Sequence, residues 1–384
     1  MTMDDLLLDR VRRRLLERPG GLTEASVAAA LREEAPVAGA GQLLDVAGDL
    51  MSEIAGAGPL EPLLALPGVT DVLVNGAGPV WVDRGRGLQA TPVAIEDEAG
   101  ARRLAVRLVA AGGRRLDDAS PYADARLADG TRVHAVLPPL APAGTCLSLR
   151  VPPRTTFTLD DLVAAGSVPR EGADLLAALI ASRVAFLVTG GTGSGKTTVL
   201  STLLSLVDRD ERVLLVEDAA ELRPDLPHVV RLEARSANAE GVGAISLDVL
   251  VRQALRMRPD RLVVGEVRGG EVLDLLAALN TGHDGGSGTV HANRAHHLPA
   301  RIEALCGQAG FPREAAHSLL LAAVDAVVHL HRARDGRRGV AGIGVLAAGP
   351  DGLARVIPAY TFGAGSVRPE PGASLLDDRL RRSP

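Results

Sequence analysis

Residues 185–198 read AFLVTGGTGSGKTT, an apolar run that leads directly into a glycine-rich loop ending in lysine and threonine. The loop satisfies the pattern G-x-x-x-x-G-K-[S/T], the Walker A motif or P-loop, and the apolar run predicts a strand at 185–189. Glycines let backbone N–H groups approach phosphate oxygens, Lys196 offers positive charge to the β- and γ-phosphates, and Thr197 offers a hydroxyl to Mg²⁺. A glycine-rich turn without function is the alternative, but the predicted flanking strand and helix favour nucleotide binding.

The residues predicted to bind the nucleotide are the nine of this loop: Gly190, Gly191, Thr192, Gly193, Ser194, Gly195, Lys196, Thr197 and Thr198. Lys196 is the only lysine in the chain. Arginine is a poor substitute for its compact ammonium group, which weakens the alternative further.

Apolar runs and helix-like periods alternate around and after the loop. Further strands are predicted at 213–216, 261–264 and 288–291, and helices at 247–256 and 271–279. Such alternation specifies a mostly parallel sheet covered by helices. An extra strand stands between the loop and the strand at 261–264, as in RecA-like motors. We therefore predict an α/β fold class with a RecA-like P-loop NTPase domain over residues 173–362.

Two strand ends in this domain carry acids. Residues 262–266, LVVGE, end in a glutamate about seventy residues after the loop, and we predict that Glu266 polarises the attacking water. Residues 214–221, LLVEDAAE, end in several acids. Glu217 and Glu221 are candidate Mg²⁺ ligands together with Thr197. Taken alone, either strand end is also explained by ordinary surface acids or a helix cap.

Residues 281–293, TGHDGGSGTVHAN, place His283 and His291 around a glycine-rich loop. A lone histidine is usually a bystander. Two histidines flanking such a loop suit a sensor that bonds differently to γ-phosphate and to its absence, and we include both among the predicted catalytic residues.

The first half of the chain has another pattern. Short β-type runs, turn signals and one helix near 96–111 predict a smaller N-terminal α+β (PAS-like) domain over residues 51–153. Helical spacing predicts a lead-in at 1–50. Prolines from Val151 onward predict a linker over 154–172, and Gly, Pro, Ser and Arg predict a disordered tail over 363–384.

The composition limits which binding partners and which cellular compartment fit this chain. The net charge is −5 and the basic residues are dispersed, which gives little for broad capture of DNA. The two cysteines, Cys146 and Cys306, form no metal-type pair, and a reducing cytoplasm fits. With no apolar run near 18 residues and no signal-like start, we expect indirect contact with the membrane. Residues 329–338, HLHRARDGRR, predict a solvated hairpin tip, with lipid or nucleic-acid contact as the alternative.

With these motifs assembled, residues 52–347 resemble the type II/IV secretion ATPase superfamily, in particular the branch that powers assembly of tight-adherence (Tad, Flp-type) pili and is associated with conjugal transfer in some bacteria. The resemblance is carried by the P-loop, the acids from Glu217 to Glu221, LRMRPDRLVVGEVRG at 255–269, and the two histidine motifs. Type II relatives usually have Asp where Gly269 stands, so this glycine resembles the Tad and type IV branch.

The resemblance implies an Mg²⁺-dependent ATPase that works as a homo-hexamer at the cytoplasmic face of the membrane and acts on an integral membrane platform protein. It implies that nucleotide lies between the two domains and that arginines of the first domain reach the phosphates. Arg132 and Arg150 resemble those arginines; salt bridging on a sheet face is the alternative for both.

Three functions fit the sequence. The first is ATP hydrolysis that powers pilus assembly or protein secretion, the second is a conjugative DNA-transfer motor with the same engine, and the third is a nucleotide-binding assembly scaffold. Aromatic residues make up 2% of the chain and leave little for stacking on single-stranded DNA. The complete set of Lys196, Thr197 and Glu266 disfavours a scaffold. We therefore expect the first function.

Overall fold

The computed structural model describes residues 56–381 except for 86, 153–155, 236–241, 283, 334–335 and 364. The chain forms two compact units, residues 1–153 and 154–384. The helical lead-in predicted at 1–50 lies outside the described residues. Of the helices described, none is both long and apolar enough to cross a membrane.

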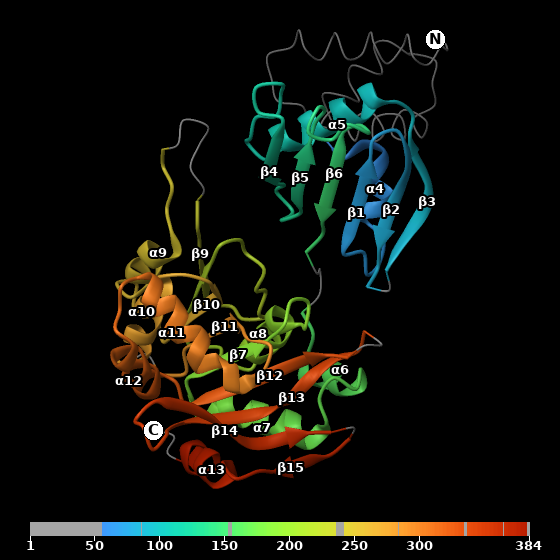
Figure 1. The fold of residues 1–384 in the computed structure, drawn as a ribbon. Helices are drawn as coiled ribbons and strands as arrows, with labels where there is room; N and C mark the ends of the chain where they lie inside the picture. Colours follow the sequence, from blue (N-terminus) through green and yellow to red (C-terminus); the bar gives the residue numbers. More distant parts are fainter. Residues whose placement is uncertain are drawn as a thin grey trace. The chain divides into compact units, whose positions relative to one another are not determined.

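The N-terminal unit is a six-stranded antiparallel sheet with one long helix (Figure 1). Its strands are β1 (Asp71–Asn75), β2 (Gly78–Asp83), β3 (Leu88–Ile95), β4 (Tyr122–Arg126), β5 (Arg132–Val136) and β6 (Cys146–Arg150). They are ordered β3-β2-β1-β6-β5-β4. Alternate residues of β1 and β6 are buried, so one face of the sheet forms a core. The helix α5 (Glu98–Ala111) packs Leu104 and Leu108 into that core beside η1 (Gly58–Leu60) and α4 (Glu61–Leu64).

The C-terminal unit is built on a nine-stranded mixed sheet (Figure 1). Its strands are β7 (Phe186–Gly190), β8 (Val213–Glu217), β9 (Val229–Glu233), β10 (Arg261–Val267), β11 (Ser287–His291), β12 (Ala326–Arg332), β13 (Arg338–Ala348), β14 (Ala354–Phe362) and β15 (Val367–Pro369). They are ordered β15-β14-β13-β12-β7-β11-β10-β8-β9. The run from β12 to β9 is parallel, and β12 to β15 pair antiparallel.

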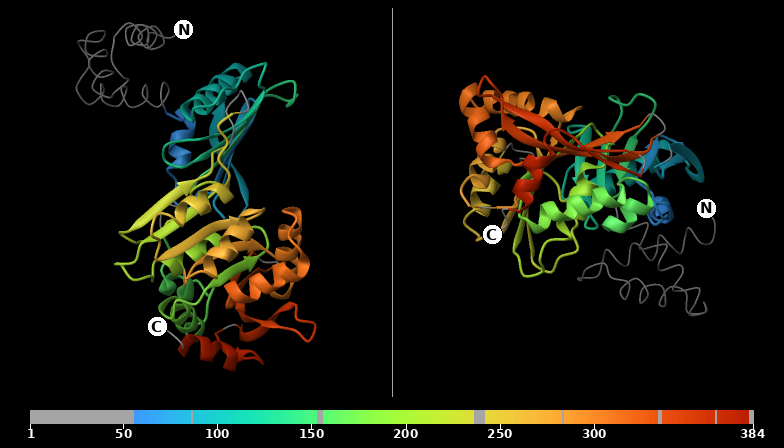
Figure 2. Two further views of the ribbon diagram at one scale, coloured as in Figure 1. Left: turned by 90° about the vertical axis from the view of Figure 1, so that its left-hand side faces the viewer. Right: turned by 90° about the horizontal axis from the view of Figure 1, so that it is seen from below.

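Helices cover both faces of this sheet (Figure 2). They are α6 (Leu159–Ala164), α7 (Arg170–Ala181), α8 (Lys196–Leu204), α9 (Leu247–Ala254), α10 (Glu271–Leu279), η2 (Ala295–His297), α11 (Leu298–Gln308), α12 (Arg313–Ala323) and α13 (Ala373–Arg381). Phe186 and Val188 of β7 join the core under α6, α7, α8 and α13, whereas Leu187 joins the core under α9 to α12. Burial on both faces explains why β7 is apolar rather than alternating. The predicted α/β class, with strands at 213–216, 261–264 and 288–291, is confirmed.

The structure corrects two predicted segments. The linker predicted at 154–172 contains α6 and the start of α7, and Leu162 of α6 is buried in the core. The disordered tail predicted at 363–384 is wrong for its described part, because β15 extends the sheet and α13 packs on it through the fully buried Leu376. Arg379 Nη2 also donates to the carbonyl oxygen of Leu346 at 2.9 Å. The composition of residues 363–384 does not predict this helix, because a single buried leucine and a few polar contacts are enough to hold it on the sheet.

Leu376→Ala is expected to lower the free energy of unfolding of the C-terminal unit by about 2–5 kcal/mol, because it removes a buried side chain and leaves a cavity. Leu375→Ala is the matched control, since this neighbouring leucine is 43% exposed, and it should cost less than about 0.5 kcal/mol. Urea unfolding followed by circular dichroism measures both. Equal effects of the two substitutions would contradict the packing of α13.

Candidate nucleotide-binding and hydrolysis site

The loop between β7 and α8 has a backbone geometry that requires glycine. Gly193 and Gly195 have φ values of +69° and +95°, in the left-handed region that other residues rarely adopt. A Cβ at Gly190 would lie 2.5 Å from Ser194 Oγ and 2.9 Å from the carbonyl oxygen of Leu330. The helix α8 begins without a side-chain cap, so N–H groups of its first turn are available to an anion. The loop therefore fits a phosphate group.

Lys196 is folded back over this loop with only 7% of its surface exposed. Its Nζ donates to the carbonyl oxygens of Gly190 at 3.2 Å and Gly191 at 3.1 Å. Burial lowers the pKa of Lys196, and the nearby negative charge of Glu266 opposes that shift. An ammonium group bonded to neutral carbonyls gains when phosphate oxygens replace them. Contact of Lys196 with phosphate stays a prediction.

Glu266 and His291 reach Lys196 from the ends of β10 and β11. Lys196 Nζ lies 3.4 Å from His291 Nε2, and His291 Nε2 lies 2.5 Å from Glu266 Oε1. Arg268 donates to the other carboxylate oxygen, Oε2 of Glu266. The ammonium and the carboxylate thus both lie close to the same nitrogen of one imidazole. Parallel pairing explains this, because the carboxyl ends of β7, β11 and β10 share one edge of the sheet.

The imidazole of His291 suits its position between a cation and an anion. Burial lowers the pKa of His291, Lys196 acts in the same direction, and Glu266 opposes both. The ring is therefore neutral at pH 7, with one nitrogen that donates and one that accepts. His283 lies outside the described residues, so its part in a sensor stays a prediction.

Glu217, at the end of β8, points into the protein. It is 4% exposed, and its Oε1 accepts hydrogen bonds from the N–H groups of Glu221 at 3.0 Å and Leu222 at 2.9 Å. Its Oε2 is buried without a hydrogen-bond partner among the described residues. Burial raises the pKa of Glu217 to about 7. A Cβ at Gly265 would lie 2.7 Å from Glu217 Cγ, so Glu217 packs directly beside the residue that precedes Glu266.

Glu221 lies where an Mg²⁺ ligand is expected. Thr197 Oγ1 donates to Glu221 Oε2 at 3.4 Å, so two predicted metal ligands are adjacent. The described residues contain no group of three or more His, Cys, Asp or Glu suited to a metal. Mg²⁺ would therefore draw on Thr197, Glu221 and phosphate oxygens, an all-oxygen set that this ion prefers. Glu217 Oε1 already accepts hydrogen bonds from the turn that follows β8, and a metal role for Glu217 stays a prediction.

The predicted arginines lie side by side in the N-terminal unit. Arg132 of β5 is directly opposite Arg150 of β6, which is opposite Asp71 of β1 and donates to its Oδ1 at 3.2 Å. Arg126 of β4 is opposite Arg132. Three arginines therefore form one row across three strands, and like charges directly opposite one another destabilise a sheet. The row is suited to an anion. Arg126 cannot be found from the sequence, because only the strand register places it there.

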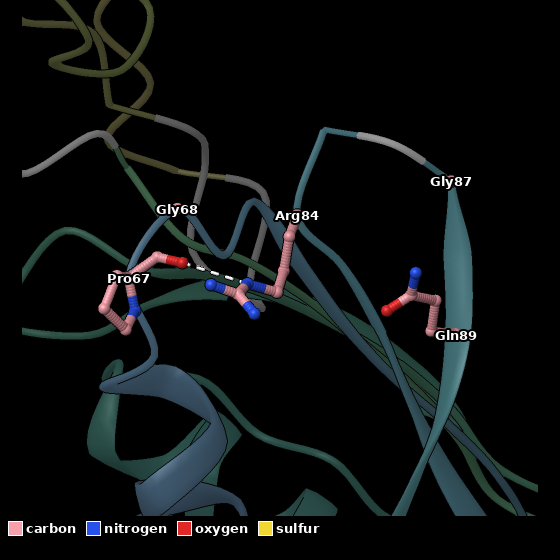
Figure 3. A pocket seen from close by; sticks show the side chains of 5 residues that line it. All are labelled: Pro67, Gly68, Arg84, Gly87 and Gln89. Carbon is pink, nitrogen blue, oxygen red and sulfur yellow. Dashed lines mark hydrogen bonds between the residues drawn. The ribbon is translucent and has the colours of Figure 1, made fainter.

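A pocket in the N-terminal unit is separate from these residues (Figure 3). Its volume is about 550 Å³, and it is lined by Pro67, Gly68, Arg84, Gly87 and Gln89. Arg84 Nε donates to the carbonyl oxygen of Pro67 at 3.0 Å, so the charged group of the lining bonds to the backbone. The pocket includes none of the predicted site residues.

Comparison with known proteins agrees with this geometry. Residues 53–340 match the family described as Type II/IV secretion system protein. The chain belongs to this family. It is 56% identical over 303 residues to a Mycobacterium tuberculosis protein named for conjugal transfer, covering 77% of this chain and 86% of that protein. The type IV secretion system protein PtlH of Bordetella pertussis is 32% identical over 300 residues, covering 71% and 86%. The structure of the Legionella pneumophila ATPase DotB matches with a TM-score of 0.52 at 19% identity, covering 80% and 81%, which shows the fold.

The chain is therefore a P-loop ATPase of the type II/IV secretion system family. The fold of this secretion ATPase brings Lys196, Glu266 and His291 together, and it places Thr197 beside Glu221. Arg268, which donates to the Glu266 carboxylate, was not among the predicted site residues. A signal was present, because Arg268 stands two residues after Glu266 in the same motif.

Glu217→Gln is expected to remove a pH dependence from the stability of this secretion ATPase. In the folded chain the pKa of Glu217 is raised from its ordinary 4.5 to about 7. The folded state therefore binds this proton more tightly than the unfolded state, and the contribution of Glu217 to stability falls as the pH rises through that interval. Gln does not ionise and keeps an acceptor oxygen for the turn. The stability of the variant relative to wild type should increase by about 2–3 kcal/mol from pH 4.5 to 7.5.

Urea unfolding of both proteins at the two pH values measures this difference. A difference that stays constant with pH would contradict a Glu217 carboxyl group that is protonated on burial.

Proposed function

We propose that this chain hydrolyses ATP with Mg²⁺ and uses the energy to power pilus assembly or protein secretion, as a hexameric motor at the cytoplasmic face of the membrane. The observation that carries the hydrolysis site is the convergence of a cation and a carboxylate on one point. Lys196 Nζ and Glu266 Oε1 lie within 3.4 Å and 2.5 Å of the same His291 nitrogen. That point adjoins a loop whose glycines and free helix start fit phosphate.

Each residue of the cluster has a distinct part in the proposed reaction. Lys196 exchanges its loop carbonyls for oxygens of the β- and γ-phosphates and neutralises charge that builds up there. Glu266 polarises the water that attacks the γ-phosphorus and takes up its proton. Mg²⁺, when bound through Thr197 and Glu221, adds charge neutralisation at the same phosphates. His291 lies between Lys196 and Glu266, so a terminal phosphate that draws Lys196 away also changes the bonding of Glu266.

Arg268 controls the orientation of Glu266 in this proposal. Its guanidinium binds Oε2 of Glu266 while His291 contacts Oε1. This ion pair raises the pKa of Arg268, so the arginine stays charged throughout the cycle. Oε1 lies 2.5 Å from His291 Nε2 but has no hydrogen-bond partner among the described residues, so the arginine fixes the carboxylate through Oε2 and leaves Oε1 for the attacking water.

The arginine row of the N-terminal unit is proposed to bind phosphate oxygens. Arg132 and Arg150 share one face of the sheet and are directly opposite each other, and Arg126 extends the row. A phosphate group would add charge-assisted contacts to this row. Arg150 also pairs with Asp71, so the row keeps a salt bridge as well as the proposed phosphate contact.

The motor role and its partners rest on family membership and on one residue. We propose a homo-hexamer that acts on an integral membrane platform protein and contacts the membrane only through it. Gly269 resembles the Tad and type IV branch, which supports a pilus of the tight-adherence class. PtlH, a relative at 32% identity, is named as a type IV secretion system protein, which supports transport as the purpose of the cycle.

A conjugative DNA-transfer motor is the second candidate. The relative at 56% identity, which is named for conjugal transfer, favours it. The net charge of −5 and the aromatic content of 2% disfavour direct contact with DNA, because single strands are bound by basic grooves and aromatic side chains.

Glu266→Gln is expected to bind ATP normally and to hydrolyse it at least about 100-fold more slowly, because an amide cannot accept the proton of the attacking water. Lys196→Ala should lose binding as well, since it removes the phosphate-facing cation. Glu370→Gln is the matched control, because Glu370 accepts from Thr361 Oγ1 at 3.1 Å beside β15, at the far end of the strand order. Phosphate release and fluorescent-nucleotide binding measure the two properties. Wild-type hydrolysis by Glu266→Gln would show that another residue activates the water.

DNA is expected to leave the ATPase rate within about twofold of its basal value across a salt series, because a net charge of −5 with dispersed basic residues offers little gain from counterion release. The assay compares phosphate release with and without single-stranded and duplex DNA. Strong stimulation at low salt that fades as salt rises would favour the conjugative motor over the pilus motor.

A further inference from the structure

The glycine-rich loop has a second wall, formed by the β12–β13 hairpin. β12 pairs in parallel with β7 as far as the partners His329 and Thr189 and then continues to Arg332 beside the loop. Leu330 is in direct contact with it, since its carbonyl oxygen lies 2.9 Å from a Cβ placed at Gly190. The residues of β12 beyond His329 are therefore placed to face a molecule held by the loop.

Arg332 and Arg338 stand at this wall. They are direct partners in the antiparallel pair of β12 and β13, so their side chains project from the same face of the hairpin. Arg332 Nη1 lies 3.3 Å from a Cβ placed at Gly193, and Arg338 Cδ lies 4.0 Å from a Cβ placed at Gly195. Both side chains are exposed. Two arginines thus border the two glycines that take the left-handed conformation.

The charges of this pair are not balanced within the described residues. No hydrogen bond or ion pair joins either guanidinium to another described residue, in contrast to Arg355 on the neighbouring strand, which pairs with Asp351 at 3.2 Å. Like charges directly opposite one another destabilise an antiparallel pair. An anion between them and the loop would turn this repulsion into two charge-assisted contacts.

The strand order shows which part of a nucleotide these arginines face. In the sheet the strands are ordered β12-β7-β11-β10. His291 and Glu266 lie on the β11 and β10 side of the loop, and the arginine pair lies on the β12 side. A terminal phosphate near Lys196 and Glu266 leaves the rest of the nucleotide to continue along the loop. In this orientation the arginine pair would face the inner phosphates, which ATP and ADP share.

We propose that Arg332 and Arg338 form a second cationic contact for the bound nucleotide, at its α- and β-phosphates, on the opposite side of the loop from the hydrolysis residues. This inference rests on the proposed binding of ATP at the loop. The pair contributes to affinity for ATP and ADP alike and does not distinguish them, because it does not reach the γ-phosphate. It also gives the hairpin tip, which sequence analysis explained as a solvated turn, a part in holding the product after hydrolysis.

The test compares Arg332→Gln, Arg338→Gln and the double variant with the same positions changed to Lys. In the full-length protein, each Gln change is expected to raise the Kd for ADP and the KM for ATP by about tenfold, the equivalent of one charge-assisted hydrogen bond. The kcat at saturating ATP should stay within about twofold, and the Lys variants should recover part of the affinity. The effect should weaken as salt rises, since both groups are exposed.

Arg355→Gln is the matched control, because it removes an exposed arginine from the same sheet without approaching the loop. A Kd for ADP in the double variant equal to that of wild type would overturn the inference. So would an equal loss in the Lys variants, or a fall in kcat with unchanged KM. These outcomes leave the proposed function standing, whereas wild-type protein that neither binds nor hydrolyses ATP would end both.

Discussion

The ammonium group of Lys196 is a buried positive charge that is not in direct contact with a carboxylate of the described residues. It bonds to two loop carbonyls, and both it and Glu266 Oε1 lie close to His291 Nε2. Direct pairing with a carboxylate would satisfy the charge and leave less to gain from phosphate. Glycine backbone geometry, a helix that begins without a cap and three parallel strand ends hold the cation in this state.

The acids around that cation differ in how deeply they are buried. Glu217 is enclosed, is held by two backbone N–H groups and has a raised pKa, so it acts as part of the scaffold beside Gly265. Glu266 and Glu221 remain near the loop, where Arg268 and Thr197 contact them. This difference in burial follows from the direction of the side chains. The carboxylate of Glu217 points into the protein, and those of Glu266 and Glu221 point toward the phosphate loop.

Local patterns predicted the position of the glycine-rich loop and of the strands around it. The P-loop, the strand that carries Glu266 and the strand that ends at His291 were each visible because they consist of consecutive residues with a strong period or a specific motif. The predictions of a linker at 154–172 and of a disordered tail at 363–384 were wrong because the contacts that order these segments are distant in sequence. The helix α13 is stabilised by a buried leucine and by an arginine that bonds to a strand distant in sequence, and neither contact leaves a mark on composition.

The sequence by itself determined the chemistry, because phosphate binding requires particular residue types at short, fixed spacings: glycines that admit a left-handed backbone, one lysine, one threonine and an acid at a strand end. Only the tertiary structure decided which charges meet. Strand order sets Glu266 and His291 on one side of the loop and Arg332 with Arg338 on the other, and register aligns Arg126 with Arg132 and Arg150. These residues are far apart in sequence, and pairing between strands is a property of the folded sheet that no short stretch contains.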